Sequence, residues 1–155
     1  MPHRRRHIVS NTCYEICFRA KETLPFVCYK LIRLIIGAAM ARTQRDDKVV
    51  ICHDIWNGSH AHIILVAKDA QQFVNFYGEL QKRITDALKR LTGRESLSLW
   101  EGYPMVAEIG DLAAAIDRIA YIYANPAQDN LVENIKPEFL LNYIHYMSTT
   151  IQAAA

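Results

Sequence analysis

Apolar residues recur along the chain with the two periods that are typical of strands and of helices. Segments rich in β-branched and aromatic residues predict strands over residues 7–18, 49–56 and 60–67. Over residues 70–91 the apolar residues recur at helical spacing instead, and Gly93 follows as a helix stop signal. This segment is therefore predicted to be a long amphipathic helix with its polar side in solvent.

The rest of the chain continues this alternation. Helical spacing predicts a helix over 23–42 and a last helix over 111–124, which Pro126 ends. Short strands are predicted over 97–100 and 105–109, on either side of a Gly-Tyr-Pro turn. The order β-α-β-β-α-β-α favours an α+β fold: a ferredoxin-like antiparallel sheet with two crossover helices on one face, plus a C-terminal helix that carries a tyrosine.

Two histidines open the strand predicted over 60–67. Side chains two residues apart in a strand point the same way, so His60 and His62 project from one face, while Ala61 and Ile63 face the core. Asn57-Gly58 predicts a tight hairpin turn just before them. The pair can be half of a metal site, or it can simply occupy the wet face of a half-buried strand.

The helix predicted over 111–124 has one apolar side and one polar side. At about 100° per residue, four side chains cluster into its predicted core face: Leu112, Ile116, Ile119 and Tyr123. Tyr121 points the other way, and Asn125 lies one turn beyond it on the same side. A phenol is a poor nucleophile at neutral pH, but a divalent cation on a phosphate makes its attack feasible. The histidine pair, Tyr121 and the Asn125 amide are therefore a candidate phosphoryl-transfer site, with Asn125 and water completing the metal shell.

Composition restricts the other classes of function. A chain of 155 residues is long enough for one domain with a real core, and its formal net charge is only +2. A nucleic-acid partner therefore needs locally concentrated cations, and the candidates are Arg4, Arg5, Arg6, Lys82 and Arg83. The four cysteines lie in apolar runs without C-x-x-C spacing, which predicts buried, reduced thiols and a cytoplasmic protein.

Charged residues interrupt both apolar stretches that resemble targeting or membrane segments. Glu15 and Lys21 break the apolar run that follows the first arginines, so a signal peptide is not predicted. Lys30 and Arg33 interrupt residues 24–41, which fits an amphipathic core helix and not a membrane span. We therefore expect neither secretion nor a membrane partner.

Two motifs in this order resemble those of the IS200-like family, the HUH-type single-tyrosine transposases, and specifically their REP-associated branch. His60-Ala61-His62 corresponds to the His-hydrophobe-His motif, and Tyr121-Ile122-Tyr123-Ala124-Asn125-Pro126 to the Tyr-Ile-x-x-Asn-Pro signature. The resemblance runs from about residue 7 to 132. Ala61 is smaller than the usual middle residue, and Asn57-Gly58-Ser59 replaces the usual Met-Pro-Asn.

The resemblance implies a nucleoid-associated bacterial enzyme, monomeric or homodimeric, that binds single-stranded DNA hairpins from repetitive palindromes. It implies that Tyr121 forms a 5′-phosphotyrosine link and leaves a 3′-hydroxyl, with Mg²⁺ or Mn²⁺ held by His60 and His62. Residues after 136 match nothing in the family. We therefore assign a transposase domain to 1–136 and a divergent tail, from a truncated or frameshifted copy, to 137–155.

Two other functions compete with the transposase reading. If Asn57-Gly58 is a two-residue turn, His53 lies directly across from His62, and the three histidines can bind zinc as in a metal hydrolase. Otherwise His53 is a strand residue beside the site that steers phosphate. The second alternative is a domain that binds hairpin DNA without catalysis. An RNA-recognition sheet is disfavoured because residues 63–66 lack aromatic side chains.

Overall fold

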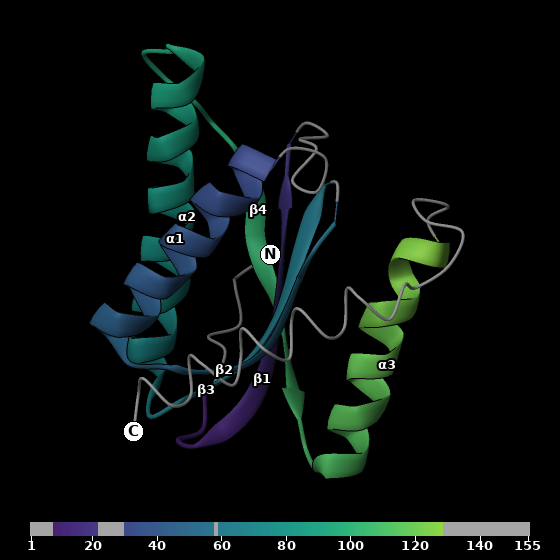
Figure 1. Ribbon diagram of the computed structural model, residues 1–155. Coiled ribbons are helices and arrows are strands. Elements are labelled where there is room, and N and C mark those ends of the chain that lie inside the picture. The colour runs from purple at the N-terminus through teal and green to yellow at the C-terminus, as the bar shows by residue number, and fades with distance from the viewer. Residues whose placement is uncertain (1–7, 22–29, 58, 129–155) are drawn as a thin grey trace. The chain divides into compact units, whose positions relative to one another are not determined.

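The computed structural model describes residues 8–21, 30–57 and 59–128, with side chains up to residue 124. The elements run in the order β1 (Thr12–Ala20), α1 (Lys30–Asp47), β2 (Val50–Trp56), β3 (His60–Ala67), α2 (Ala70–Thr92), β4 (Trp100–Ile109) and α3 (Leu112–Gln128) (Figure 1). The predicted order β-α-β-β-α-β-α is confirmed. The chain divides into two compact units, residues 1–116 and 117–155.

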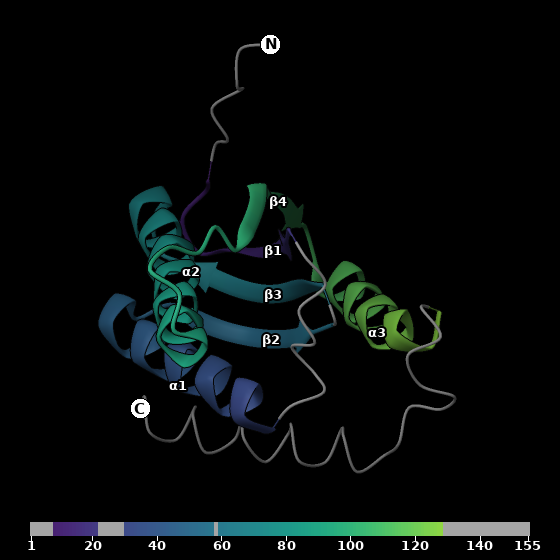
Figure 2. The ribbon, with the colours of Figure 1, turned by 90° about the horizontal axis from the view of Figure 1, so that it is seen from above.

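The four strands of the first unit form one antiparallel sheet in the order β2-β3-β1-β4. Helices α1 and α2 lie together on one side of this sheet (Figure 2). The predicted α+β fold with a ferredoxin-like antiparallel sheet is therefore confirmed. We call the covered side the helix face and the other side the histidine face.

The core lies between the helix face and the two helices. Strand residues on this face alternate with residues on the histidine face, as the period of two predicts, and Ala61 and Ile63 are fully buried there. The buried stripe of α2 comprises Phe73, Phe76, Leu80, Ile84 and Leu88. Each such large side chain stabilises the fold by roughly 1.5–3 kcal/mol through removal of apolar surface from water.

Local signals fix both ends of α2. The Asp69 carboxylate accepts a hydrogen bond from the Gln72 backbone N–H at 2.7 Å, which satisfies a donor of the first turn. Gly93 follows in the left-handed conformation, with φ 64°, and its backbone N–H bonds to the carbonyl oxygen of Arg90. The predicted stop at Gly93 is confirmed.

Several element boundaries differ from the predictions. β1 begins at Thr12, and α1 continues to Asp47, five residues beyond its predicted end at 42. The predicted start of that helix at residue 23 lies outside the described residues. The predicted end of the last helix before Pro126 is wrong, because α3 continues through this proline to Gln128. Pro126 lies in the last turn, where its missing backbone N–H removes only one hydrogen bond.

The two short strands predicted on either side of the Gly-Tyr-Pro turn are one strand, β4. Its pairing with β1 shifts between Cys17 and Arg19, so β4 contains an irregularity, and Gly102 there has a φ of 54°. Pro104 fits because β4 is an edge strand, where a missing backbone N–H breaks no inner ladder.

Three of the four cysteines are described, and all three are free thiols. Cys52 is exposed and Cys13 and Cys17 are partly exposed, so the prediction of buried thiols is wrong for these positions, while Cys28 lies outside the described residues. No helix among the described residues has the length and apolar character needed to cross a membrane.

Candidate active site

His60 and His62 lie side by side on the histidine face. Their ring centroids are 5.0 Å apart and the ring planes are inclined by 81°. The pairing of β3 with β1 places Arg19 beside His60 and Cys17 beside His62. The prediction that the two imidazoles project from one face is confirmed, and both side chains are buried, so they do not occupy a wet face.

A buried carboxylate orients His62. Glu15, two residues before Cys17 in β1, lies with its Oε1 atom 2.7 Å from Nδ1 of His62, and both side chains are almost fully buried. The Cys17 sulfur lies 4.0 Å from the other ring nitrogen, Nε2. Burial by itself lowers the pKa of His62, but hydrogen bonds to Cys17 and Glu15 outweigh it and raise the pKa to about 9. Without a metal, His62 is therefore an imidazolium at neutral pH.

The loop before β3 orients His60. Its Nε2 atom lies 3.1 Å from the side-chain amide nitrogen of Asn57, and its Nδ1 atom lies 3.3 Å from the Ser59 hydroxyl. Asn57 is buried, and its backbone N–H donates to the His60 carbonyl at 2.8 Å. Asn57 therefore both closes the loop and fixes the ring.

These residues fit a divalent cation. Metal-binding histidines commonly give their second ring nitrogen to a carboxylate, and Glu15 does this for His62, leaving Nε2 as the candidate ligand atom. The Asn57 side chain turns its amide nitrogen, and not its oxygen, toward Nε2 of His60, so it orients this ring and is not counted as a metal ligand. Among the described residues no group of three or more His, Cys, Asp or Glu side chains can hold a metal, so water or substrate must supply other ligands.

The three-histidine alternative is wrong. Trp56 pairs with Ala61 and not with Ser59, and the register of β2 shifts between Ile51 and His53. Ile55 therefore lies across from His62, and His53 lies beside Ile64. The loop is longer than the two-residue turn that the sequence suggested, which moves His53 along the strand.

His53 does not fit the role of a phosphate-steering residue either. Its side chain is buried, and this burial lowers its pKa to about 4. A neutral, buried imidazole offers a phosphate no positive charge at neutral pH. This expectation is therefore not supported.

Tyr121 lies on α3, in the second unit, and is 46% exposed, as predicted. The guanidinium of Arg118, three residues before it, lies 4.8 Å from the centre of its ring. The predicted core face of this helix is partly wrong, because Leu112 and Ile116 are 76% and 58% exposed and Ile122 is the fully buried residue. Helical periodicity shows which side of a helix is most apolar, but it does not show which side packs against the rest of the protein. Asn125 belongs to α3, but its side chain lies outside the described residues.

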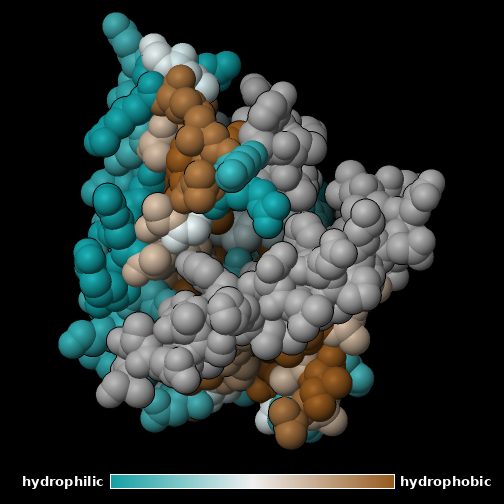
Figure 3. Space-filling view, viewed as in Figure 1, coloured by the Kyte–Doolittle hydropathy of each residue, from teal (hydrophilic) through white to brown (hydrophobic). Residues whose placement is uncertain are grey.

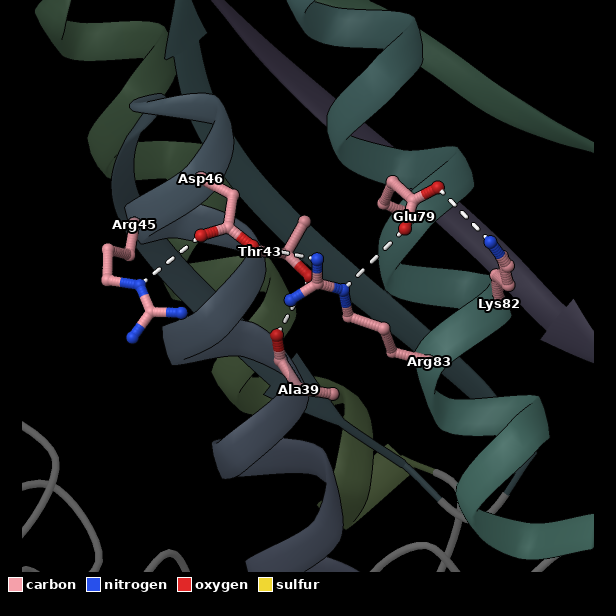
Figure 4. A network of polar contacts seen from close by, with 7 residues as sticks. All are labelled: Ala39, Thr43, Arg45, Asp46, Glu79, Lys82 and Arg83. Carbon is pink, nitrogen blue, oxygen red and sulfur yellow. Dashed lines mark hydrogen bonds and ion pairs between the residues drawn. The ribbon is translucent and has the colours of Figure 1, made fainter.

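Two basic residues of α2, Lys82 and Arg83, are engaged in ion pairs. Arg83 contacts Asp46 of α1 at 2.8 Å and Glu79 at 3.7 Å, and Lys82 contacts Glu79 at 3.7 Å (Figure 4). Hydrogen bonds from Arg83 and Arg45 lower the pKa of Asp46. The outer surface of these helices is largely hydrophilic, as the left side of Figure 3 shows. Lys82 and Arg83 thus form a solvated surface on the side of the sheet away from the histidines; Arg4, Arg5 and Arg6 lie outside the described residues.

Sequence reasoning missed two members of the site, Glu15 and Asn57. A single carboxylate in an otherwise apolar strand was the available signal for Glu15, since an unpaired buried charge is costly. Asn57 had been assigned only to a turn. The sequence signals for Glu15 and Asn57 do not show that these residues contact His62 and His60.

Neither a protein family model nor a curated protein matches this sequence. Solved structures do match. A REP-associated tyrosine transposase bound to a REP hairpin has a TM-score of 0.72 and 18% identity, over 86% of this chain and 77% of that chain. A candidate transposase from Deinococcus radiodurans has a TM-score of 0.51 and 16% identity, over 79% of this chain and 95% of that chain. The chain therefore has the fold of an IS200/REP-type transposase.

Proposed function

We propose that this protein is a transposase or nicking enzyme for single-stranded DNA that uses Tyr121 as its nucleophile and a divalent cation on His60 and His62. The observation that carries the proposal is the buried set of His60, His62 and Glu15 on the histidine face of a transposase fold. The motifs around His60 and Tyr121 support the same assignment.

The energetic cost of this set favours a functional role. Removing an imidazolium and a carboxylate from water costs several kcal/mol per ion, and well-packed apolar residues often stabilise a protein as well or better. Glu15 and His62 lie in the two central strands, where apolar residues would pack. Glu15 and His62 at these positions therefore make the fold less stable than apolar residues would. We attribute their presence to a role in binding a metal and a phosphate.

In the proposed reaction, the Tyr121 oxygen attacks the phosphorus of a DNA phosphodiester. A bond forms between this oxygen and phosphorus, and the bond from phosphorus to the 3′-oxygen breaks. The phenol proton leaves to solvent, and the departing 3′-oxygen takes up a proton to become a hydroxyl. A bound Mg²⁺ or Mn²⁺ would polarise the phosphate and stabilise the developing charge.

The remaining groups hold the participants in place. Glu15 fixes the orientation of the His62 ring, and Asn57 fixes that of His60, so both imidazoles are preorganised. Arg118 contacts the face of the Tyr121 ring, and a cation–π contact of this exposed kind contributes about 0.5–1 kcal/mol. We propose that Asn125, one helical turn after Tyr121, supplies a further metal ligand.

The experiment is covalent trapping. The protein is incubated with a labelled single-stranded DNA hairpin and Mn²⁺, and a denaturing gel is read for label that migrates with the protein. Tyr121→Phe should bind the hairpin and form no adduct, because only the attacking hydroxyl is lost. Tyr123→Phe is the matched control and should form adduct normally. Adduct in Tyr121→Phe together with its absence in Tyr123→Phe would refute the assignment of the nucleophile.

A hairpin-binding protein without catalysis is the second candidate. The observation that favours it is the raised pKa of His62, because an imidazolium must release its proton before it can bind a metal. Hairpin binding by the wild-type protein with no adduct in Mn²⁺ would establish this alternative.

A further inference from the structure

Among the described residues, Arg19 of β1 is a cation on the histidine face that the proposed reaction does not use. Its side chain is exposed, and none of the ion pairs among the described residues includes it. The strand registers place Arg19 between His60 of β3 and Glu101 of β4, all on one face. Side chains directly opposite in an antiparallel pair have Cβ atoms about 4.5–5.5 Å apart. Arg19 is therefore an immediate neighbour of the histidine pair.

The irregular segment of β4 lies on the other side of Arg19. Cys17 pairs with Met105 and Arg19 pairs with Glu101, so three residues of β4, Gly102-Tyr103-Pro104, stand opposite Phe18 alone. The left-handed Gly102 makes this bulge possible. Bulges often redirect side chains next to active sites. Here the bulge presents Tyr103, which is 76% exposed, between Glu101 and Met105.

An arginine and an exposed aromatic ring side by side are suited to binding the phosphates and the unpaired bases of single-stranded nucleic acid. Guanidinium groups bind phosphate oxygens through paired hydrogen bonds, and aromatic rings stack on unpaired bases whatever their sequence. Because adjacent strands are about 4.8 Å apart, the row from β3 through β1 to β4 spans about 10 Å. The row thus continues from the histidine pair to a phosphate-binding group and then to a base-stacking group.

We propose that Arg19 binds a phosphate of the substrate strand beside the histidine pair and that Tyr103 stacks on a neighbouring base. This inference rests on the proposed function and specifies how the DNA strand runs across the sheet. Glu101 lies next to Arg19 and repels the same phosphate, so it weakens binding. The charges of two neighbouring residues in one row therefore act on DNA affinity in opposite directions.

The test measures binding alone, without metal. Affinity of the full chain for a fluorescent single-stranded DNA hairpin is determined by anisotropy in EDTA over a series of salt concentrations. Arg19→Gln should weaken binding and lower the slope of log affinity against log salt by about 0.7, the share of one phosphate contact on a single strand. Glu101→Gln should strengthen binding. Arg94→Gln is the matched control, because Arg94 is also exposed but follows α2, one of the two helices that cover the helix face.

Tyr103 is tested with its own pair of variants. Tyr103→Leu should weaken hairpin binding at least about five-fold, because loss of one stacked base costs roughly 1–3 kcal/mol, and Tyr103→Phe should retain wild-type affinity. Equal thermal melting of all variants and wild type verifies that each is folded. If Arg19→Gln and Arg94→Gln change the slope equally, or if Tyr103→Leu binds like wild type, the inference is overturned.

The outcome for this inference is distinguishable from that for the proposed function. If the wild-type chain binds no hairpin, the proposed function fails, and the inference fails with it. If the wild-type chain binds the hairpin and forms adduct while the Arg19 and Tyr103 variants bind normally, only the inference fails. If these variants bind weakly while Tyr121→Phe binds normally, the inference is supported independently of catalysis.

Discussion

Replacing Glu15 by glutamine tests the buried pair with His62 through the pH dependence of stability. The folded protein raises the pKa of His62 from 6.5 to about 9, so folding favours the charged imidazolium. Stability from this source is fully present below pH 6.5 and is lost as the pH rises through about 9. At 1.36 kcal/mol per pKa unit the full effect is about 3 kcal/mol, and about 2 kcal/mol of it is lost between pH 6.5 and 8.5.

The assay is urea unfolding in EDTA at several pH values from 6.5 to 8.5, with the free energy of unfolding taken by linear extrapolation. The wild-type protein should lose about 2 kcal/mol across this range. Glu15→Gln should be less stable at pH 6.5 and nearly flat above it, because the amide carries no charge to hold the proton on His62. Burial raises the pKa of Cys13 to about 11, so this thiol does not titrate up to pH 8.5.

Two controls make this result decisive. Glu101→Gln removes an exposed carboxylate from the same face and should leave the pH profile of unfolding unchanged. His62→Gln should flatten the profile as Glu15→Gln does, because the titrating group itself is absent. A flat wild-type profile, or a slope that survives in Glu15→Gln, would contradict the assignment of the buried pair.

Two further predictions concern the titration of His53 and the binding of Mn²⁺. Burial lowers the pKa of His53 to about 4, so the protein should lose stability as the pH falls from 6.5 through 4, by about 3 kcal/mol in all, and His53→Leu should remove this acid loss in urea unfolding. Mn²⁺ binding, measured by calorimetry, should become tighter as the pH rises from 6.5 toward 9, because His62 must release its proton before it can bind the metal. His60→Ala and His62→Ala should each abolish Mn²⁺ binding. An Mn²⁺ affinity that is constant over this pH range would contradict the role of His62.

The elements of the fold could be predicted from the sequence because their signals are local. The apolar stripe of α2, its Gly93 stop and the alternation in β3 each depend on residues within one element. The register between strands is not local. The loop between β2 and β3 is longer than two residues and places His53 beside Ile64 instead of His62. The bulge in β4 joins two predicted strands into one. Residue spacing within a single strand marks neither feature.

The candidate site was predictable to the same extent. His60 and His62 are two residues apart in one strand, so their common face followed from strand geometry alone. Glu15 precedes His62 by 47 residues, and only the pairing of β1 with β3 brings the two together. The burial of both imidazoles and the raised pKa of His62 also depend on this packing, so neither follows from the spacing of the two histidines.

One face of the sheet carries apolar pairs that stabilise the fold, and the other carries the polar groups of the candidate site. On the helix face, Ile16 and Ile63 pair directly and are completely buried, so each stabilises the fold by removing apolar surface from water. Neither side chain carries a charge, so this contribution does not depend on pH. On the histidine face, the neighbouring pairs place Cys17 beside His62 and Arg19 beside His60 in the same two strands. Because both faces share one backbone register, the rigid apolar pairs on one side fix the positions of the polar groups on the other. The core therefore preorganises the site: a slip of one residue between β1 and β3 would exchange the faces and remove Glu15 from His62.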